Sequence, residues 1–129
     1  MKIKRGRKRN PFLRLLSHIK NSGSRARAMT KSRLGQKIPV GVTEKDLEEI
    51  YKKQNARCFW FNVPLDLNLL YEKWHPLAPS ADRLDESKGY TKNNIVICTR
   101  FANLGRQRYN INKFHDIVDY LKKEFKNEI

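Results

Sequence analysis

Hydrophobic positions in the first part of the chain recur with the period of a helix. In segment 11–20, "PFLRLLSHIK", four apolar residues fall on one helical face: Phe12, Leu15, Leu16 and Ile19. Pro11 lies where a first helical turn accepts proline. We expect a second helix, or a continuation of the first, over 24–35, with a break or kink at Gly23 and an end at Gly35.

The pattern changes after a Gly- and Pro-containing linker at 35–42. Segment 43–56 predicts a core helix, with Thr43 as its N-cap and Asp46 three residues later. Segment 57–61, "RCFWF", is short and aromatic and predicts a buried strand. Segment 67–74, "LNLLYEKW", is ambiguous between a strand and irregular structure.

Two strands and two helices are predicted in the last third. Segment 79–85, "PSADRLD", and the β-branched segment 94–99, "NIVICT", predict strands on either side of a turn at 86–90. A helix of two or three turns follows at 100–109, and an amphipathic helix at 110–125. The apolar stripe of the last helix consists of Phe114, Ile117, Val118, Leu121 and Phe125. The order strand, turn, strand, helix within a helical chain predicts an α+β fold around a ββα unit.

Positive charge is concentrated at the N-terminal end. The chain has 129 residues with 28 Lys and Arg against 13 Asp and Glu, a formal net charge of +15. The first 37 residues hold 13 Lys or Arg and no acid, because the first acidic residue is Glu44. Such a block is typical of a protein with a polyanionic partner. No segment approaches the roughly 20 apolar residues of a membrane span, and no apolar stretch follows the basic start as in a signal peptide.

We therefore divide the chain into a disordered basic arm at 1–10, a basic helical DNA-binding extension and linker at 11–42, and a folded core at 43–129. A length of 129 residues fits one domain. The candidate DNA contacts are Arg5, Arg7, Lys8, Arg9, Arg14, Arg25, Arg27, Arg33, Arg100, Arg106 and Arg108. The alternative for the helical ones is a solvated polar face.

The two cysteines, Cys58 and Cys98, are far apart and form no C-x-x-C pair. This argues against a disulfide scaffold and against a structural zinc site, which takes four Cys or His ligands. A reducing cytoplasm fits this cysteine usage.

Asp82 and Asn103 are candidates for a metal site. They are 21 residues apart, but a ββα hairpin places the end of its first strand beside the first turns of its helix. Carboxylate and amide oxygens are hard ligands, and Mg²⁺ usually takes only one or two protein ligands. Such an ion stabilises the charge that develops when a phosphodiester is cleaved. The residues alone favour the alternative of a turn Asp and a helix-surface Asn.

The segments "QNARCFW" and "HPLAPSADRLDESKGYTKNNIVICTRFANLGR" resemble the HNH, or ββα-metal, nuclease superfamily, in particular small phage HNH proteins and restriction enzymes of the PacI type. The resemblance covers roughly residues 24–109 and rests on D-R-x-D, G-Y-x-x-x-N and a later Asn as a set. It implies a ββα-metal fold and a DNA endonuclease that uses Mg²⁺ or Mn²⁺, with Asp82 and Asn103 as metal ligands. Asn94 matches the middle Asn of the motif, which ties the loop to the hairpin.

The chain departs from the family pattern at the general base. The family usually has His after the Asp, and here Arg83 takes that place. Arg cannot accept a proton at a workable pH, so Arg83 is expected to clamp the scissile phosphate. His75, seven residues before Asp82, is the first candidate base, although it can equally be an ordinary surface His. His18 and His115 rank lower because they lie on predicted helices.

A second departure concerns zinc. Many relatives pin the hairpin with two C-x-x-C pairs, of which only Cys58 remains here, so no structural zinc is expected. Aromatic packing is expected in its place, from Phe59, Trp60, Phe61 and Phe101.

The sequence is consistent with three functions. The leading one is a metal-dependent HNH endonuclease that nicks as a monomer or cuts both strands as a homodimer, in the cytoplasm of a phage-infected cell. Its biological role stays open between homing, packaging-linked cutting and attack on host DNA. Its substrate stays open between duplex and branched DNA. The second is a catalytically inactive DNA-binding protein on the HNH scaffold, which the missing base His favours. The third is a small RNA-binding or ribosome-associated protein.

Overall fold

The computed structural model describes residues 10–29, 40–107 and 109–128, with the backbone alone at 21–29, 127 and 128. Within these residues the chain forms four α-helices and one antiparallel sheet of two strands, so the predicted α+β class is confirmed. The predicted arm lies, apart from Asn10, outside the described residues. Among the helices described here, none is long and apolar enough to cross a membrane.

Helix α1 spans Pro11–Met29. Asn10 caps its start, because its Oδ1 accepts the backbone N–H of Phe12 at 2.8 Å. The helix continues through Gly23 to Met29, so of the two predicted alternatives the continuation is confirmed there and the break is wrong. Glycine inside a helix costs only about 1 kcal/mol relative to alanine, which the neighbouring turns offset. The predicted helical part beyond Met29 lies outside the described residues.

Helix α2 spans Glu44–Lys53 and begins at the predicted cap. Thr43 Oγ1 accepts the N–H of Asp46 at 3.2 Å, and the Asp46 carboxylate accepts the N–H of Thr43 at 3.0 Å. This reciprocal pair satisfies two backbone donors that the first helical turn leaves free. Leu47 and Ile50 on its buried face pack in the core.

The predicted strand at 57–61 is wrong. Arg57 makes one isolated bridge to Pro64, and the chain then turns at Asn62, whose φ of 58° is left-handed. The aromatic residues serve packing and not a sheet, because the Trp60 side chain turns inward and is buried. The ambiguous segment that follows forms a 3-10 helix, η2, at Leu67–Tyr71.

The two predicted strands pair as a hairpin. Strand β1 spans Pro79–Arg83 and strand β2 spans Ile95–Thr99, with Asp82 opposite Val96. A short 3-10 helix, η3, at Lys92–Asn94 leads into β2. Gln54 covers the other edge of β2: its side chain donates to the Ile97 carbonyl at 2.7 Å and accepts the Ile97 N–H at 2.9 Å.

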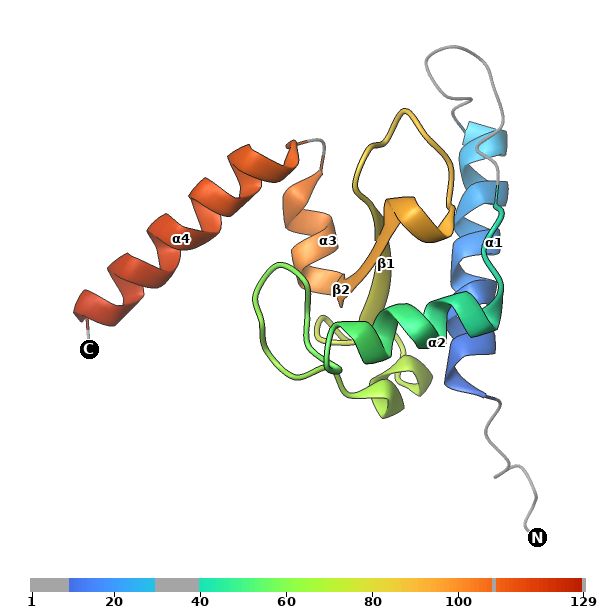
Figure 1. Ribbon diagram of the computed structural model, residues 1–129, viewed down its shortest axis with the longest axis horizontal. Coiled ribbons are helices and arrows are strands. Elements are labelled where there is room, and N and C mark those ends of the chain that lie inside the picture. The colour runs from blue at the N-terminus through green and yellow to red at the C-terminus, as the bar shows by residue number, and fades with distance from the viewer. Residues whose placement is uncertain (1–9, 30–39, 108, 129) are drawn as a thin grey trace, which may run out of the picture.

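Helix α3, Arg100–Arg106, follows β2 without a linker and packs against both strands. Thr99 begins it, because its Oγ1 accepts the N–H of Ala102 at 3.1 Å. Helix α1 lies against β1 and α2, and α2 lies against β2, so helices enclose the hairpin (Figure 1). This enclosure explains why all five residues of β2 are buried.

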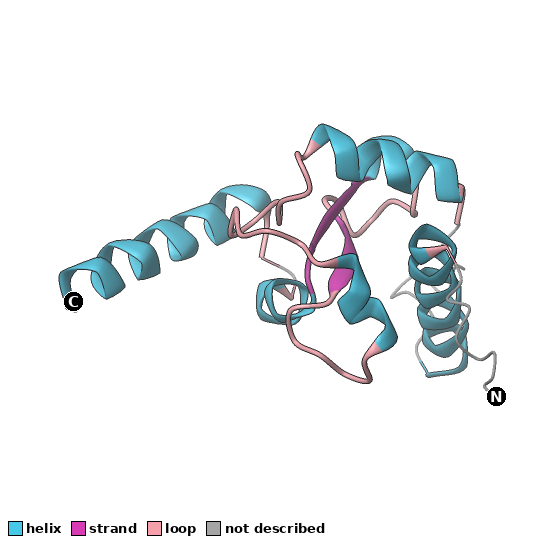
Figure 2. Ribbon diagram, turned by 90° about the horizontal axis from the view of Figure 1, so that it is seen from below, coloured by secondary structure: helices cyan, strands magenta, loops and turns pink. Residues whose placement is uncertain are grey.

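Helix α4, Ile111–Glu128, confirms the predicted amphipathic helix, but its apolar stripe is only partly buried. Phe114 and Val118 are buried, but Leu121 and Phe125 on the same stripe are exposed. The helix leads away from the hairpin, with its C-terminal half beyond the other elements (Figures 1 and 2). The apolar stripe therefore joins the core only through its first two turns.

Candidate functional site

Polar side chains meet where β1 lies against α3. Ser80 and Asp82 are two residues apart on the strand and so share a face, while Asn103 and Arg106 share a helix face. Asn103 Nδ2 donates to Ser80 Oγ at 2.8 Å and to the Ala81 carbonyl at 3.2 Å. Arg106 Nη1 donates to Asp82 Oδ1 at 2.8 Å. The contact thus pairs Asp82 with Arg106, and Asn103 with Ser80.

The Asp82–Arg106 ion pair is buried and fully hydrogen-bonded. Asp82 is 7% exposed and Arg106 is 4% exposed. The second carboxylate oxygen, Oδ2, accepts the indole N–H of Trp60 at 2.9 Å. The guanidinium also donates to the carbonyls of Arg83 at 2.6 Å and Leu84 at 2.8 Å. A buried charge needs such partners, so this pair locks α3 to β1.

This arrangement does not fit a metal ion shared by Asp82 and Asn103. Both Asp82 oxygens are engaged, and a dication there would meet the charge of the Arg106 guanidinium. Asn103 Oδ1, in contrast, accepts no hydrogen bond from any of the described residues. No group of three His, Cys, Asp or Glu suited to a metal occurs in the described part of the chain. The Mg²⁺ or Mn²⁺ site stays a prediction.

Arg83 contacts the turn of its own hairpin. Its Nη1 donates to the carbonyls of Glu86 at 2.8 Å and Lys88 at 2.9 Å. The guanidinium carbon lies 5.1 Å from the centre of the Tyr90 ring, within the range of a cation–π contact. These contacts stabilise the turn, and the expected phosphate clamp remains untested.

Asn94 ties the same turn together from the buried side. Its Nδ2 donates to the carbonyls of Asp85 at 3.0 Å and Gly89 at 2.9 Å. Its Oδ1 accepts the N–H of Asp85 at 2.9 Å. Asn94 therefore holds the loop to the hairpin, as the motif implies.

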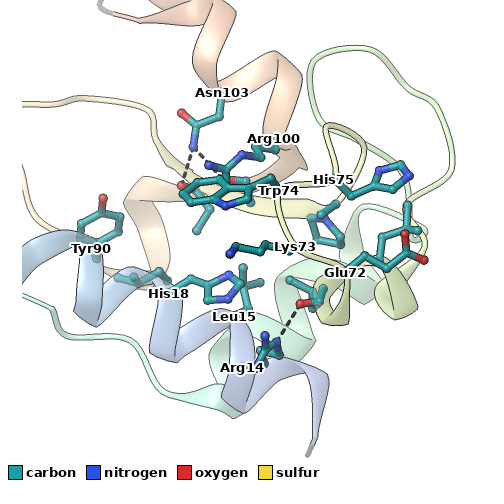
Figure 3. A pocket seen from close by; sticks show the side chains of 17 residues that line it. Arg14, Leu15, His18, Glu72, Lys73, Trp74, His75, Tyr90, Arg100 and Asn103 are labelled. Carbon is teal, nitrogen blue, oxygen red and sulfur yellow. Dashed lines mark hydrogen bonds between the residues drawn. The ribbon is translucent and has the colours of Figure 1, made fainter. Parts of the chain in front are cut away.

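A cavity of about 390 Å³ opens between α1, β1, α3 and the turn after η2 (Figure 3). Arg14, Lys73 and Arg100 supply positive charge to its lining, with Glu72 as the acid. Asn103 lines it as well, whereas Asp82 does not. The cavity is therefore a basic hollow beside the hairpin–helix unit.

The two arginines of the cavity are held in place by neighbouring groups. Arg14 Nε donates to the Leu70 carbonyl at 2.7 Å, and its guanidinium carbon lies 5.4 Å from the centre of the Tyr71 ring. The Arg100 guanidinium carbon lies 4.4 Å from the centre of the Trp74 ring. Because little side-chain entropy is then lost on binding, such preorganised guanidinium groups are good phosphate ligands.

His18 is a candidate proton acceptor at the cavity. It lines the cavity from α1, where surrounding protein atoms, then Arg14 and Arg100, lower the pKa of its imidazole below the usual 6.5. His18 is therefore neutral at pH 7. His75 Nδ1 accepts the N–H of Leu77 at 3.0 Å, and its ring lies at the edge of the cavity, away from Asn103 (Figure 3).

The expected DNA contacts divide into three groups. The first group lacks described side chains: the structure describes only the backbone of Arg25 and Arg27, and it does not describe Arg5, Arg7, Lys8, Arg9, Arg33 and Arg108. Arg14 and Arg100 line the cavity. Arg106 does not follow a phosphate backbone as expected, because it is buried against Asp82.

The aromatic residues expected in place of zinc pack as a cluster extended by α4. The ring centres of Phe59 and Trp60 are 4.8 Å apart, and those of Trp60 and Phe114 are 5.0 Å apart, both edge to face. Phe61 and Phe101 lie 6.3 Å apart. Trp60, which donates to Asp82, thus also packs against Phe114 in the first turn of α4.

Sequence reasoning missed Lys73 and Trp74 and underrated His18. The signal for His18 was its spacing of four residues from Arg14 on a predicted helix, which places both on one face. No local pattern marked Lys73 or Trp74, because only the folded turn brings them to the cavity.

No protein-family model, curated protein or solved structure matches this chain.

Proposed function

We propose that this chain is a DNA-binding protein built on a hairpin–helix unit of the HNH type, with phosphate bound at the basic cavity. The observation that carries the proposal is the position of Arg14, Lys73 and Arg100 around one hollow beside β1 and α3. Arginine donates to phosphate with two parallel hydrogen bonds, and lysine contributes a point charge. The basic N-terminal third supplies further long-range attraction.

The resemblance to HNH proteins supports DNA as the partner, and the side-chain contacts favour binding over catalysis. In an HNH nuclease the residues matching Asp82 and Asn103 hold the ion. Here Asp82 is neutralised by Arg106, and Arg83 lies where the family has its base. Phosphate binding needs neither group, since the cavity cations supply it.

Metal-dependent DNA cleavage, with Mg²⁺ or Mn²⁺, is the second candidate. Two observations favour it. Asn103 lines the cavity, and its Oδ1 accepts no hydrogen bond from the part of the chain that the structure describes. His18 lines the same cavity, where its lowered pKa favours the neutral imidazole. A neutral imidazole can accept a proton from water, which Arg83 cannot. Cleavage through an ion at Asp82 would require that carboxylate to exchange Arg106 for the ion.

A supercoiled plasmid separates the two candidates. The protein is incubated with the plasmid in Mg²⁺, in Mn²⁺ and in EDTA, and each sample is analysed for strand breaks and for retarded mobility. We expect retardation in all three conditions and no metal-dependent nicking. Nicking that needs Mg²⁺ or Mn²⁺ would establish the endonuclease, and the absence of retardation in EDTA would contradict the binding proposal.

DNA binding should depend on pH through His18. A bound phosphate favours the protonated imidazole, so the His18 pKa rises on binding, and affinity should increase as the pH falls from 7.5 to 5.5. One linked proton changes affinity by at most about tenfold per pH unit. Affinities of the wild type and of His18→Gln, measured across this range at constant ionic strength, test the prediction.

The control for this test is His75→Gln, because His75 is also a histidine that lines the same cavity. The His75 variant should keep the pH dependence of the wild type, and the His18 variant should lose most of it. Equal pH dependence in the wild type and His18→Gln would exclude His18 from the phosphate site.

A further inference from the structure

Trp74 is an exposed aromatic side chain at the basic cavity. It is 62% exposed, although burial of an indole is strongly favourable. Its backbone has a φ of 60°, a left-handed conformation that is unusual for a bulky residue and costs about 1 kcal/mol or more. The turn after η2 therefore holds a large aromatic ring at the surface and does not fold it into the core.

Charged groups surround the Trp74 ring on the cavity side. Arg100 makes a cation–π contact at 4.4 Å, and Lys73 precedes Trp74 in the same turn. Figure 3 shows the indole against Arg100 in the hollow that His18 and Arg14 also line. An aromatic face beside phosphate-binding cations is the arrangement with which proteins bind unpaired nucleotides.

We propose that Trp74 stacks on an unpaired nucleobase whose phosphate contacts Arg100 and Lys73, so that the chain prefers single-stranded or branched nucleic acid to continuous duplex. In a duplex each base is already stacked on both sides, and only an unpaired base offers a free face. The cavity volume of about 390 Å³ is within the range of roughly 300–1,000 Å³ typical of sites for small organic groups. This inference rests on the proposed function and adds its substrate class.

The first test uses the intrinsic fluorescence of the whole protein in EDTA. The chain has two tryptophans, and Trp60 is only 2% exposed, so a base that stacks on the surface quenches Trp74 alone. Titration with a single-stranded oligonucleotide should quench the emission, and a long linear duplex of the same sequence should quench it far less. Trp74→Phe should abolish the quenching.

The second test measures affinity. Loss of one stacked base weakens binding by roughly 5- to 150-fold, so Trp74→Leu should lose that much affinity for the single strand and almost none for the duplex. Tyr120→Leu is the matched control, because Tyr120 is equally exposed at 62% but lies on α4, outside the cavity. It should bind both nucleic acids as the wild type does.

The outcomes separate this inference from the proposed function. Equal affinity for duplex and single strand, with Trp74→Leu indistinguishable from the wild type, would overturn the stacking inference and leave DNA binding intact. Failure of the wild type to bind either nucleic acid would overturn both. Quenching by the single strand that survives in Trp74→Phe would place the base at another site and would also overturn the inference.

Discussion

Asp82→Ala should lower the free energy of unfolding by about 3–5 kcal/mol, because it leaves the buried Arg106 guanidinium without its counter-charge. The variant also leaves the Trp60 indole N–H without its acceptor. Urea denaturation followed by circular dichroism measures the change. This decrease would be a large part of the roughly 5–15 kcal/mol typical of a folded domain, so partial unfolding at 37 °C is expected.

Two controls accompany this measurement. Asp119→Ala removes an exposed carboxylate from α4 and should change stability by no more than about 0.5 kcal/mol. The double variant Asp82→Leu with Arg106→Met removes both charges, and it should be more stable than Asp82→Ala because no buried charge is left unpaired. If the wild type nicked DNA with Mg²⁺ or Mn²⁺ and an equally stable Asp82→Ala protein did not, Asp82 would instead be a metal ligand.

Replacing Arg14 and Arg100 together by Ala should reduce affinity for DNA by about two to four powers of ten. Each charge-assisted hydrogen bond contributes about 1.5–3 kcal/mol, and every 1.4 kcal/mol is tenfold. The slope of the logarithm of affinity against the logarithm of salt concentration should also fall by about 0.9 for each phosphate group that the variant no longer neutralises. Fluorescence anisotropy of a labelled oligonucleotide at several salt concentrations gives both quantities.

Lys122→Ala with Lys123→Ala removes the same charge from α4, which leads away from the hairpin (Figure 1) and contributes no residue to the cavity lining. This control should reduce affinity less than tenfold, because it changes the overall charge without touching the proposed site. Equal reductions in the two double variants would mean that the protein attracts DNA through net charge alone. The cavity would then have no special part in binding.

Local sequence patterns predicted the elements that carry local signals. Thr43 and Asp46 marked the start of α2, and the β-branched run at 94–99 marked β2. The prediction failed at 57–61, where a strand-like aromatic run serves packing between elements. The helix at 110–125 was predicted correctly, but amphipathic spacing reveals a helix face and not whether another element covers it, so the exposure of Leu121 and Phe125 could not be predicted.

The candidate site was predicted less well than the fold. The ββα order correctly placed Asp82 and Asn103 on facing elements, since β1 and α3 pack together. The partner of Asp82 depends on the rotation of α3 about its axis, and this rotation brings Arg106, not Asn103, to the carboxylate. The cavity joins residues from α1, η2 and α3 that are far apart in sequence, so no local pattern could group them.

Nuclear magnetic resonance of the isotope-labelled protein, titrated with an oligonucleotide in EDTA, tests the central claim most directly. We expect the largest shifts at the side-chain signals of Arg14, His18, Trp74 and Arg100, with the buried Trp60 indole almost unchanged. Shifts confined to α4 or to the turn at 86–90, with the cavity signals unmoved, would contradict it.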